Sequence, residues 1–330
     1  MRHVFTAACA CLLSMAACAR EADGSLGLVL LPNDARPALV QSGGTFSVLT
    51  RAEAELRLTS VSATHSLSTA WARLPSGLYE GVSHVPAEIA AGTYTLEADS
   101  DGGEDRNSRS VFVYDVFPVS YRIAHLTNLR IGAETGRDTR IYQSTKAINE
   151  AGVSIVLVTG DLTSAGSREQ FAQALDLLSD CRAPTLVSLG SAEIASALSR
   201  DYLGPATFTH RFGLDGYLGY YTSELGELDL RGRSGKLHRA RRSIRDARWS
   251  VGFTNHYGPE SCLRDQLVLF RDNPLDYVIC AKRPGGDQAQ FSVPWGRTSG
   301  FAMQATARGA VQIFDVGLGG LQLVQGPGSE

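Results

Sequence analysis

The sequence predicts two folded parts, an all-β immunoglobulin-like sandwich followed by a larger α/β domain. From residue 27 to about residue 114, short runs of alternating apolar and polar residues are separated by glycine, proline and serine, which is typical of antiparallel strands. From residue 121 onward, apolar runs of strand length alternate with helix-length segments, which favours βαβ units and a largely parallel sheet. With 330 residues and 43% hydrophobic content, the chain can bury more than one core.

Residues 1–17 have the features of a signal peptide, with a short basic start, an apolar run and small residues before Cys18. The apolar run is too short to span a bilayer. A cysteine directly after Ala16-Ala17 resembles the lipobox of bacterial lipoproteins, which implies cleavage before Cys18 and lipidation of that cysteine. We therefore expect anchoring to membrane lipid in the bacterial cell envelope, at the periplasmic face of the outer membrane. An ordinary signal peptide with an incidental cysteine is the alternative.

The first domain is expected to consist of short strands. We assign residues 18–26 to a polar tether, 27–115 to the β-sandwich, 116–120 to a linker and 121–330 to the α/β domain. The strands expected in the sandwich are residues 45–49, 54–58, 67–74, 77–82, 93–98 and 109–114. Six or seven strands at this spacing are typical of an immunoglobulin-like sandwich, which would hold the second domain away from the membrane.

The second domain is expected to alternate strands and helices. The expected strands are residues 121–126, 154–159, 185–189, 249–254, 275–280, 301–307 and 311–316, and the expected helices are residues 139–151, 167–179, 235–247 and 262–271. Ser167 followed by Gln170 indicates a capping box at the start of the second helix. Phe171, Leu175 and Leu178 share the helix face that would pack on the sheet.

Polar tips follow five of these strands. They are Asn128-Leu129-Arg130, Gly160-Asp161, Gly190-Ser191-Ala192-Glu193, Asn255-His256 and Ala281-Lys282-Arg283-Pro284. Because parallel strands end at one edge of a sheet, we expect these tips to surround one cavity. In their order and spacing, they resemble the motifs of the calcineurin-like metallophosphoesterase family, over about residues 121–323.

The resemblance implies a four-layer α/β/β/α sandwich with two divalent metal ions, of the Mn, Fe or Zn class, at the strand tips. Asp161 matches the metal-bridging aspartate, and His256 matches a histidine ligand. The other ligand positions are altered. Asn128 and Arg130 replace the Asp-x-His pair, Ser191 and Ala192 replace the asparagine and histidine of the third motif, and Lys282 and Pro284 replace the two histidines of the last.

These losses predict a pseudoenzyme that acts in binding or scaffolding and needs no cofactor. Two ions need several oxygen and imidazole donors, and only Asp161 and His256 keep that chemistry. An active metal-dependent phosphoesterase with an atypical site, in which Asp161, His256 and Glu193 take part, is the first alternative. A structural envelope lipoprotein is the second. The sequence names no ligand or protein partner.

Three cations lie at the altered tips, namely Arg130, Lys282 and Arg283. Guanidinium groups bind phosphate oxygens in pairs, so the cavity would suit a phosphorylated ligand that is not cleaved. The alternative is drift in an inactive cavity, with these side chains turned to solvent. Both interpretations remain open.

Charge and cysteine content add three expectations. The chain has 31 Lys and Arg residues against 34 Asp and Glu, so no nucleic acid partner is expected. Residues 231–248 are rich in arginine and predict a helix with a basic outer face, either for anionic lipid or as a solvated charged face paired with Asp and Glu residues elsewhere. Cys280 is expected to be a buried small hydrophobe, and a bridge from Cys262 to Cys280 is left open.

Overall fold

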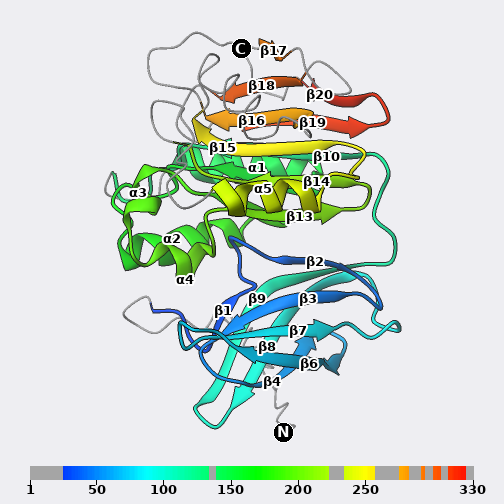
Figure 1. Cartoon of the computed structure of the whole chain (residues 1–330), viewed down its shortest axis with the longest axis vertical. Coiled ribbons are helices and arrows are strands. Elements are labelled where there is room, and N and C mark those ends of the chain that lie inside the picture. Colours follow the sequence, from blue (N-terminus) through cyan, green and yellow to red (C-terminus); the bar gives the residue numbers. More distant parts are fainter. Residues whose placement is uncertain are drawn as a thin grey trace, which may run out of the picture.

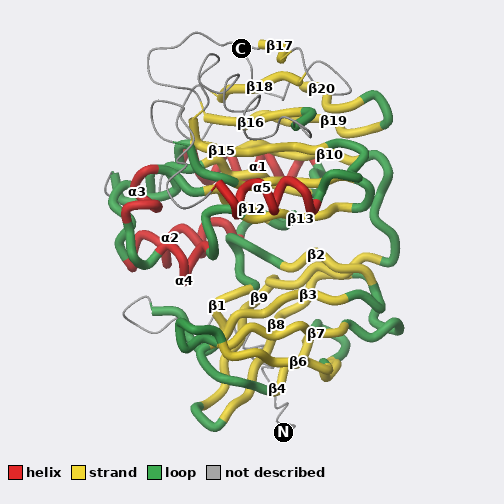
Figure 2. The backbone as a smooth tube through the Cα atoms, viewed as in Figure 1, coloured by secondary structure: helices red, strands yellow, loops and turns green. Residues whose placement is uncertain are grey.

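The computed structural model describes residues 25–133, 139–222, 234–256, 275–281, 291–293, 300–305 and 311–324. Figure 1 shows two bodies one above the other, and Figure 2 shows that the helices belong to only one of them. The prediction of a mixed α/β fold with several sheets is confirmed. The signal peptide, Cys18, most of the tether and the expected helix at residues 262–271 lie outside the described residues.

The N-terminal body is a sandwich of two sheets. One sheet has the order β1 (Val29–Leu31), β3 (Thr45–Thr50), β7 (Tyr79–His84) and β6 (Ser68–Arg73). The other has the order β2 (Ala38–Gln41), β9 (Gly103–Tyr114), β8 (Gly92–Ser100), β4 (Glu55–Thr59) and β5 (Thr64–Ser66). Val48, Leu58 and Leu96 are fully buried between the sheets. The sequence did not predict β1, β2 and β5, because three or four residues are too few to show alternation.

The second body contains two further sheets. The first has the order β12 (Thr185–Ser188), β11 (Ile155–Thr159), β10 (Tyr121–Thr127), β19 (Val311–Gly317) and β20 (Gly320–Val324). The second has the order β13 (Phe208–Phe212), β14 (Asp215–Gly219), β15 (Ser250–His256), β16 (Tyr277–Ala281), β18 (Gly300–Ala305) and β17 (Phe291–Val293). Strands β10, β11 and β12 are parallel, as are β14, β15, β16 and β18. The carboxyl ends of these strands therefore lie at one edge of each sheet.

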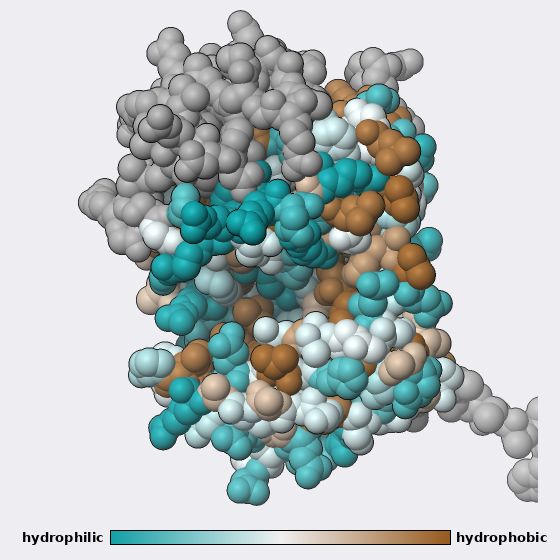
Figure 3. Space-filling model, turned by 45° about the vertical axis from the view of Figure 1, so that its right-hand side comes forward, coloured by the Kyte–Doolittle hydropathy of each residue, from teal (hydrophilic) through white to brown (hydrophobic). Residues whose placement is uncertain are grey.

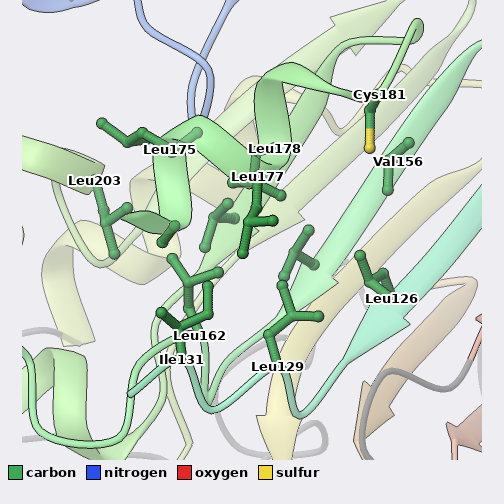
Figure 4. Close-up of a cluster of buried hydrophobic side chains, with 14 of the residues drawn as sticks. Leu126, Leu129, Ile131, Val156, Leu162, Leu175, Leu177, Leu178, Cys181 and Leu203 are labelled. Carbon is green, nitrogen blue, oxygen red and sulfur yellow. The ribbon is translucent and has the colours of Figure 1, made fainter. Parts of the chain in front are cut away.

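Four layers result from the packing of helices on the outer faces of the two sheets. The helices are α1 (Thr139–Ala151), α2 (Arg168–Ser179), α3 (Ser191–Ala195), α4 (Ser199–Leu203) and α5 (Ser234–Ser243). Figure 4 shows Leu175 and Leu178 of α2 in one buried cluster with Val156 and Leu126 of the first sheet. Leu237 of α5 packs with the second sheet. Inner side chains of both sheets form a separate cluster, so the sheets face each other.

Local signals predicted the first two helices well. Helix α1 covers the expected range, and α2 starts after Ser167, whose Oγ accepts a hydrogen bond from the amide of Gln170 at 3.3 Å. The capping box is only half formed, because the Gln170 side chain bonds to Ser164 and to the amide of Ala165 instead. Helix α5 ends at Ser243 rather than at the predicted Ala247.

A segment of the N-terminal body covers the edge of the first sheet. The amide of Val187 in β12 donates to the carbonyl of Ala35 at 3.1 Å, and the Thr185 hydroxyl donates to the carbonyl of Asp34. Leu26 and Leu30 join the core under α1 and α2. The otherwise unpaired edge of β12 is thereby closed, and the two bodies are joined by buried contacts.

Within the described part of the chain, no helix is both long and apolar enough to cross a membrane.

Candidate functional site

The tips of three strands from the two facing sheets meet at one place. Gly160 follows β11 with φ 58°, and a Cβ there would collide with the Cβ of Asn255 and lie 3.0 Å from the Cα of Gly190. A Cβ on Gly190 would in turn collide with the amide nitrogen of Asp161. Glycine at both positions therefore permits the close approach of these backbones. The fold therefore brings together the predicted site residues that adjoin Gly160, Gly190 and Asn255 in the sequence.

The loop after β10 lies beside the loop after β11. The amide of Arg130 donates to the carbonyl of Asp161 at 2.8 Å, and the amide of Ile131 donates to Leu162 at 2.9 Å. Asn128, Arg130 and Asp161 adopt left-handed φ values of 55°, 45° and 48°. Such backbone is tolerated by Asn and Asp but is uncommon for Arg, and strained residues of this kind cluster at functional sites. The Arg130 side chain is exposed, whereas Asn128 and Asp161 are partly buried.

Glu193 connects the tips of β11 and β12. Its side chain is fully buried, and Oε1 accepts hydrogen bonds from the amide and the hydroxyl of Thr163, both at 2.7 Å. Oε2 accepts from the amide of Gly190 at 2.7 Å. Burial raises the pKa of Glu193, the hydrogen bonds oppose this effect, and the nearby Asp161 adds to the rise. Both carboxylate oxygens are thus occupied in holding two loops together, away from solvent.

His256 is held in one tautomer by its neighbour Asn255. The Asn255 Oδ1 accepts from the backbone amide of Thr222 at 3.2 Å, and this fixes the orientation of the Asn255 amide. Its Nδ2 then donates to Nδ1 of His256 at 3.1 Å, so the proton of a neutral His256 ring lies on Nε2. Histidine ligands normally donate from one ring nitrogen and bind metal through the other. The tautomer inferred from this hydrogen bond differs from that arrangement.

Ser191 and Ala192 begin helix α3 beside the same tips. The Ser191 Oγ is buried, and it has no hydrogen-bond partner among the described residues. Ala192 is partly buried and offers no polar side-chain atom. Neither residue supplies the amide oxygen or imidazole nitrogen that the family motif has at these positions.

A two-metal centre does not fit the described residues at this site. Asp161 contributes one carboxylate, Glu193 is occupied by backbone amides, and His256 has the wrong tautomer for ligation through Nε2. In the described ranges, no group of three or more His, Cys, Asp or Glu side chains is arranged to hold a metal ion. Lys282, Arg283 and Pro284 lie outside the described residues.

The arginine-rich run does not form a uniformly basic outer face. Arg241 is 2% exposed, and its Nη2 donates to the Ser250 hydroxyl at 3.0 Å. Arg248 turns inward to Asp215, which is fully buried. Lys236, Arg239 and Arg242 are exposed. The prediction of a basic outer face was wrong for Arg241 and Arg248, because polar groups of neighbouring strands bind these two guanidinium groups. The ion pair of Arg248 with Asp215 agrees with the alternative of pairing with acidic residues. Arg231 and Arg233 lie outside the described residues.

Cys280 is fully buried in β16, among the apolar side chains beneath α5. This placement agrees with a small hydrophobic role. Cys262 lies outside the described residues, so a bridge between the two stays a prediction.

No protein-family model matches the sequence, and no curated protein matches it. Among solved structures, the chain is similar to a purple acid phosphatase from yellow lupin (Lupinus luteus) seeds, with a TM-score of 0.47 and 11% identity over 88% of this chain and 66% of that one. It is also similar to Vacuolar Protein Sorting 29 from Cryptosporidium parvum, with a TM-score of 0.31 and 10% identity over 63% of this chain and 97% of that one. Both are metallophosphoesterase-fold proteins. We assign the α/β/β/α architecture from the strand order and the layers, not from these likenesses.

Three residues that contribute to the site were not singled out from the sequence. Thr163 binds Glu193, Thr222 orients Asn255, and Asn255 sets the tautomer of His256. Asn255 directly precedes His256 in the same strand tip, so the sequence already places it near the site. Thr222 lies 33 residues away from Asn255, and only the fold brings the two together.

Proposed function

We propose that residues 121–323 form a calcineurin-like metallophosphoesterase-type domain that has lost the two-metal centre and acts in binding or scaffolding. The observation that supports this proposal best is the hydrogen bond from Asn255 to Nδ1 of His256. Of Asp161 and His256, the two residues that keep the family's ligand type, it leaves only Asp161 in a form that suits a metal ion. The locked carboxylate of Glu193 supports the same conclusion.

Metal analysis combined with phosphoesterase assays tests this proposal. The full chain, an Asp161→Ala variant and an Asp176→Ala control on the surface of α2 would be assayed with phosphomonoesters and phosphodiesters in the presence of Mn²⁺. We expect no stoichiometric metal and no turnover in any of the three. Turnover that disappears in Asp161→Ala but persists in Asp176→Ala would overturn the pseudoenzyme and establish the active alternative.

A second candidate function is the binding of a phosphorylated ligand at the strand tips. Arg130 favours it, because this exposed arginine occupies a left-handed position next to Asp161 at the site. Lys282 and Arg283 would add charge on the basis of the sequence alone. Titration with inorganic phosphate and with phosphodiesters, followed by calorimetry, is the test. Binding that is weakened about tenfold by Arg130→Ala but not by Arg122→Ala supports the site. No heat at millimolar ligand excludes it.

We further propose that the chain is a lipoprotein of the bacterial cell envelope, anchored through Cys18. The support is the signal-like composition of residues 1–17 and the small residues before the cysteine. Metabolic labelling with an alkyne fatty acid would label the wild-type chain and leave a Cys18→Ser variant unlabelled. Equal labelling of both would exclude anchoring at this position. A purely structural envelope role remains the alternative if neither enzyme nor ligand assays give a signal.

The N-terminal sandwich is proposed to be immunoglobulin-like and to act as a spacer. In an immunoglobulin fold, strands A, B, E and D form one sheet, and C, F and G form the other. The observed orders β1-β3-β7-β6 and β9-β8-β4-β5 follow this scheme when β1 is strand A, β3 is B, β4 is C and β9 is G. Strand β2 adds to β9 in parallel. A spacer role predicts that membrane distance, rather than ligand affinity, changes when this body is replaced by another sandwich.

A further inference from the structure

A cavity lies between the N-terminal sandwich and the α/β body, away from the strand tips. It has a volume of about 540 Å³, and its walls come from β2 and β3 on one side and from β13 on the other. Figure 3 shows the surface hollowed between the two bodies, with hydrophobic and hydrophilic residues next to each other. None of the strand-tip residues lines this cavity.

Arg36 lines the cavity as a buried cation without a counter-charge. Its side chain is 7% exposed, and no described carboxylate forms an ion pair with it. Among the described residues, its Nη2 reaches two backbone carbonyls alone, those of Val187 and Pro205, both at 3.4 Å. The Nε atom is buried and has no partner within the described ranges. A desolvated guanidinium that lacks a carboxylate is costly to bury, so an incoming anion would relieve a cost already present in the fold.

The local structure holds this guanidinium in place at the cavity wall. Its carbon Cζ lies 3.2 Å from the centre of the Phe208 ring, where a cation is attracted to the aromatic face. Gly204, with φ 73°, leaves room on the other side, since a Cβ there would lie 3.3 Å from Nη1 of Arg36. Burial lowers the pKa of Arg36 to about 9, which is consistent with an uncompensated charge. The group remains protonated at neutral pH.

The remaining walls suit an organic anion rather than a bare ion. Arg200 and Arg211 also line the cavity, against one acidic residue, Glu80. Arg211 is engaged by Asp246 on the surface, whereas Arg200 is exposed. The rest of the lining includes the apolar residues Leu31, Pro37, Phe46, Leu49, Leu74 and Phe208. An excess of positive charge beside apolar walls matches a ligand with one oxyanion group and an apolar body.

We propose that this cavity is a binding site for a small organic oxyanion, a carboxylate or a phosphate monoester with an apolar body. The oxyanion binds against Arg36, with Arg200 at the rim, and the apolar part lies against β2 and β3. Because residues of both bodies line the cavity, a bound ligand also stabilises the interface between them.

Thermal-shift and calorimetric titrations of the full chain test the site with defined probes. Benzoate and phenyl phosphate carry both features, benzyl alcohol lacks the charge, and inorganic phosphate lacks the apolar body. We expect benzoate to bind at one site per chain, and both organic anions to raise the melting temperature. Titrations of the Arg130→Ala variant separate this binding from any phosphate bound at the strand tips. Benzyl alcohol and inorganic phosphate should bind more weakly, by about tenfold or more. Equal binding of benzyl alcohol and benzoate, or no binding of either anion, would overturn the proposal.

Variants separate this cavity from the strand tips and from a merely structural role of Arg36. Arg36→Met should abolish the shift caused by benzoate while leaving the melting temperature of the unliganded protein unchanged or higher, because a buried charge is removed. If that variant does not fold, Ser47→Trp on β3 tests the site independently by filling the cavity. Arg200→Ala should weaken binding less than Arg36→Met.

Arg130→Ala at the strand tips serves as the matched control and should leave benzoate binding unchanged. Loss of benzoate binding in Arg130→Ala, with retention in Ser47→Trp, would place the anion at the strand tips and reject the interface site.

Discussion

The two ends of the facing sheets bury polar groups in different ways. At the amino ends, Asp215 is fully buried and accepts two hydrogen bonds from Arg248, at 2.9 and 2.5 Å. It accepts two more from the Tyr121 hydroxyl at 2.9 Å and the Trp249 amide at 3.1 Å. Burial raises the pKa of Tyr121 and that of Tyr217, so both phenols stay neutral. Each oxygen of the carboxylate therefore accepts one hydrogen bond from the charged Arg248 and one from a neutral donor.

At the carboxyl ends, the polar groups are held mainly by backbone. Glu193 accepts two of its three hydrogen bonds from amide groups, and the surrounding loops adopt left-handed φ values at Asn128, Arg130 and Asp161. Ser191 has a buried hydroxyl without a partner in the described part of the chain. Each end keeps a buried polar atom without a partner among the described residues, Ser191 Oγ at the carboxyl end and Arg248 Nη1 at the amino end. The two ends differ in their backbone, because within the described ranges only the carboxyl end has the left-handed non-glycine residues that mark strain. Stability and ligand chemistry are expected to lie at opposite ends.

The largest effect is predicted at the amino end. Asp215→Ala should lower the free energy of unfolding by about 3–5 kcal/mol, because it leaves Arg248 largely buried without its partner. Urea denaturation of the variant and the wild type measures the difference. Asp246→Ala is the matched control, since Asp246 pairs with Arg211 at the solvent-exposed surface, and a much smaller change is expected there. Equal effects of the two substitutions would show that the buried network at the amino end stabilises the fold no more than a surface ion pair does.

Between the two ends, His125 should make stability depend on pH. It is fully buried in β10, where Nδ1 bonds to Gln312 at 3.0 Å and Nε2 to Thr159 at 2.6 Å. Burial lowers its pKa from 6.5 to about 4, and the bond to Gln312 opposes this only in part. At pH values between 4 and 6.5, the unfolded chain binds more protons than the folded chain does. The free energy of unfolding therefore falls as the pH is lowered from 6.5 to 4, by about 3 kcal/mol in total.

A His125→Gln variant tests this linkage because glutamine keeps two polar atoms but does not titrate. Denaturation at several pH values between 4 and 7 should give a shallower dependence for the variant than for the wild type. Identical slopes for the two proteins would show that His125 is not the group responsible.

A smaller effect on stability is predicted for Glu193 at the carboxyl end. Glu193→Ala leaves the amides of Thr163 and Gly190 without their acceptor, and it should lower the free energy of unfolding by about 1–3 kcal/mol. Thermal denaturation is the measurement, with Glu150→Ala on the exposed face of α1 as the control. The control should change stability by about 0.5 kcal/mol or less. If Glu193→Ala is as mild as the control, the carboxylate is available for other roles, and the active-site alternative gains support.

The sequence predicted the helices and strands better than it predicted the side-chain hydrogen bonds at the site. Helix α1 and the start of α2 follow from local periodicity and from Ser167, which act within a few residues. The strand tips could be located because apolar runs of strand length end there in short polar segments.

Long-range contacts account for what the sequence did not predict. The tautomer of His256 depends on Thr222, which lies in a different segment of the chain. The closure of the β12 edge by Asp34 and Ala35 depends on the packing of two bodies. The inward turn of Arg241 and Arg248 depends on Ser250 and Asp215, whose burial no local pattern reveals.

The smallest effect is predicted for Ser191 at the carboxyl end. A buried hydroxyl without a partner already bears its desolvation cost, so Ser191→Ala should leave the free energy of unfolding unchanged or raise it by up to about 1 kcal/mol. Ser188→Ala is the matched control on the preceding strand, because its buried hydroxyl donates to the carbonyl of Val158 at 3.3 Å. That control should lose about 1 kcal/mol. A clear loss of stability in Ser191→Ala, measured by thermal denaturation, would show that the hydroxyl is hydrogen-bonded in solution and is not an unsatisfied group of the carboxyl end.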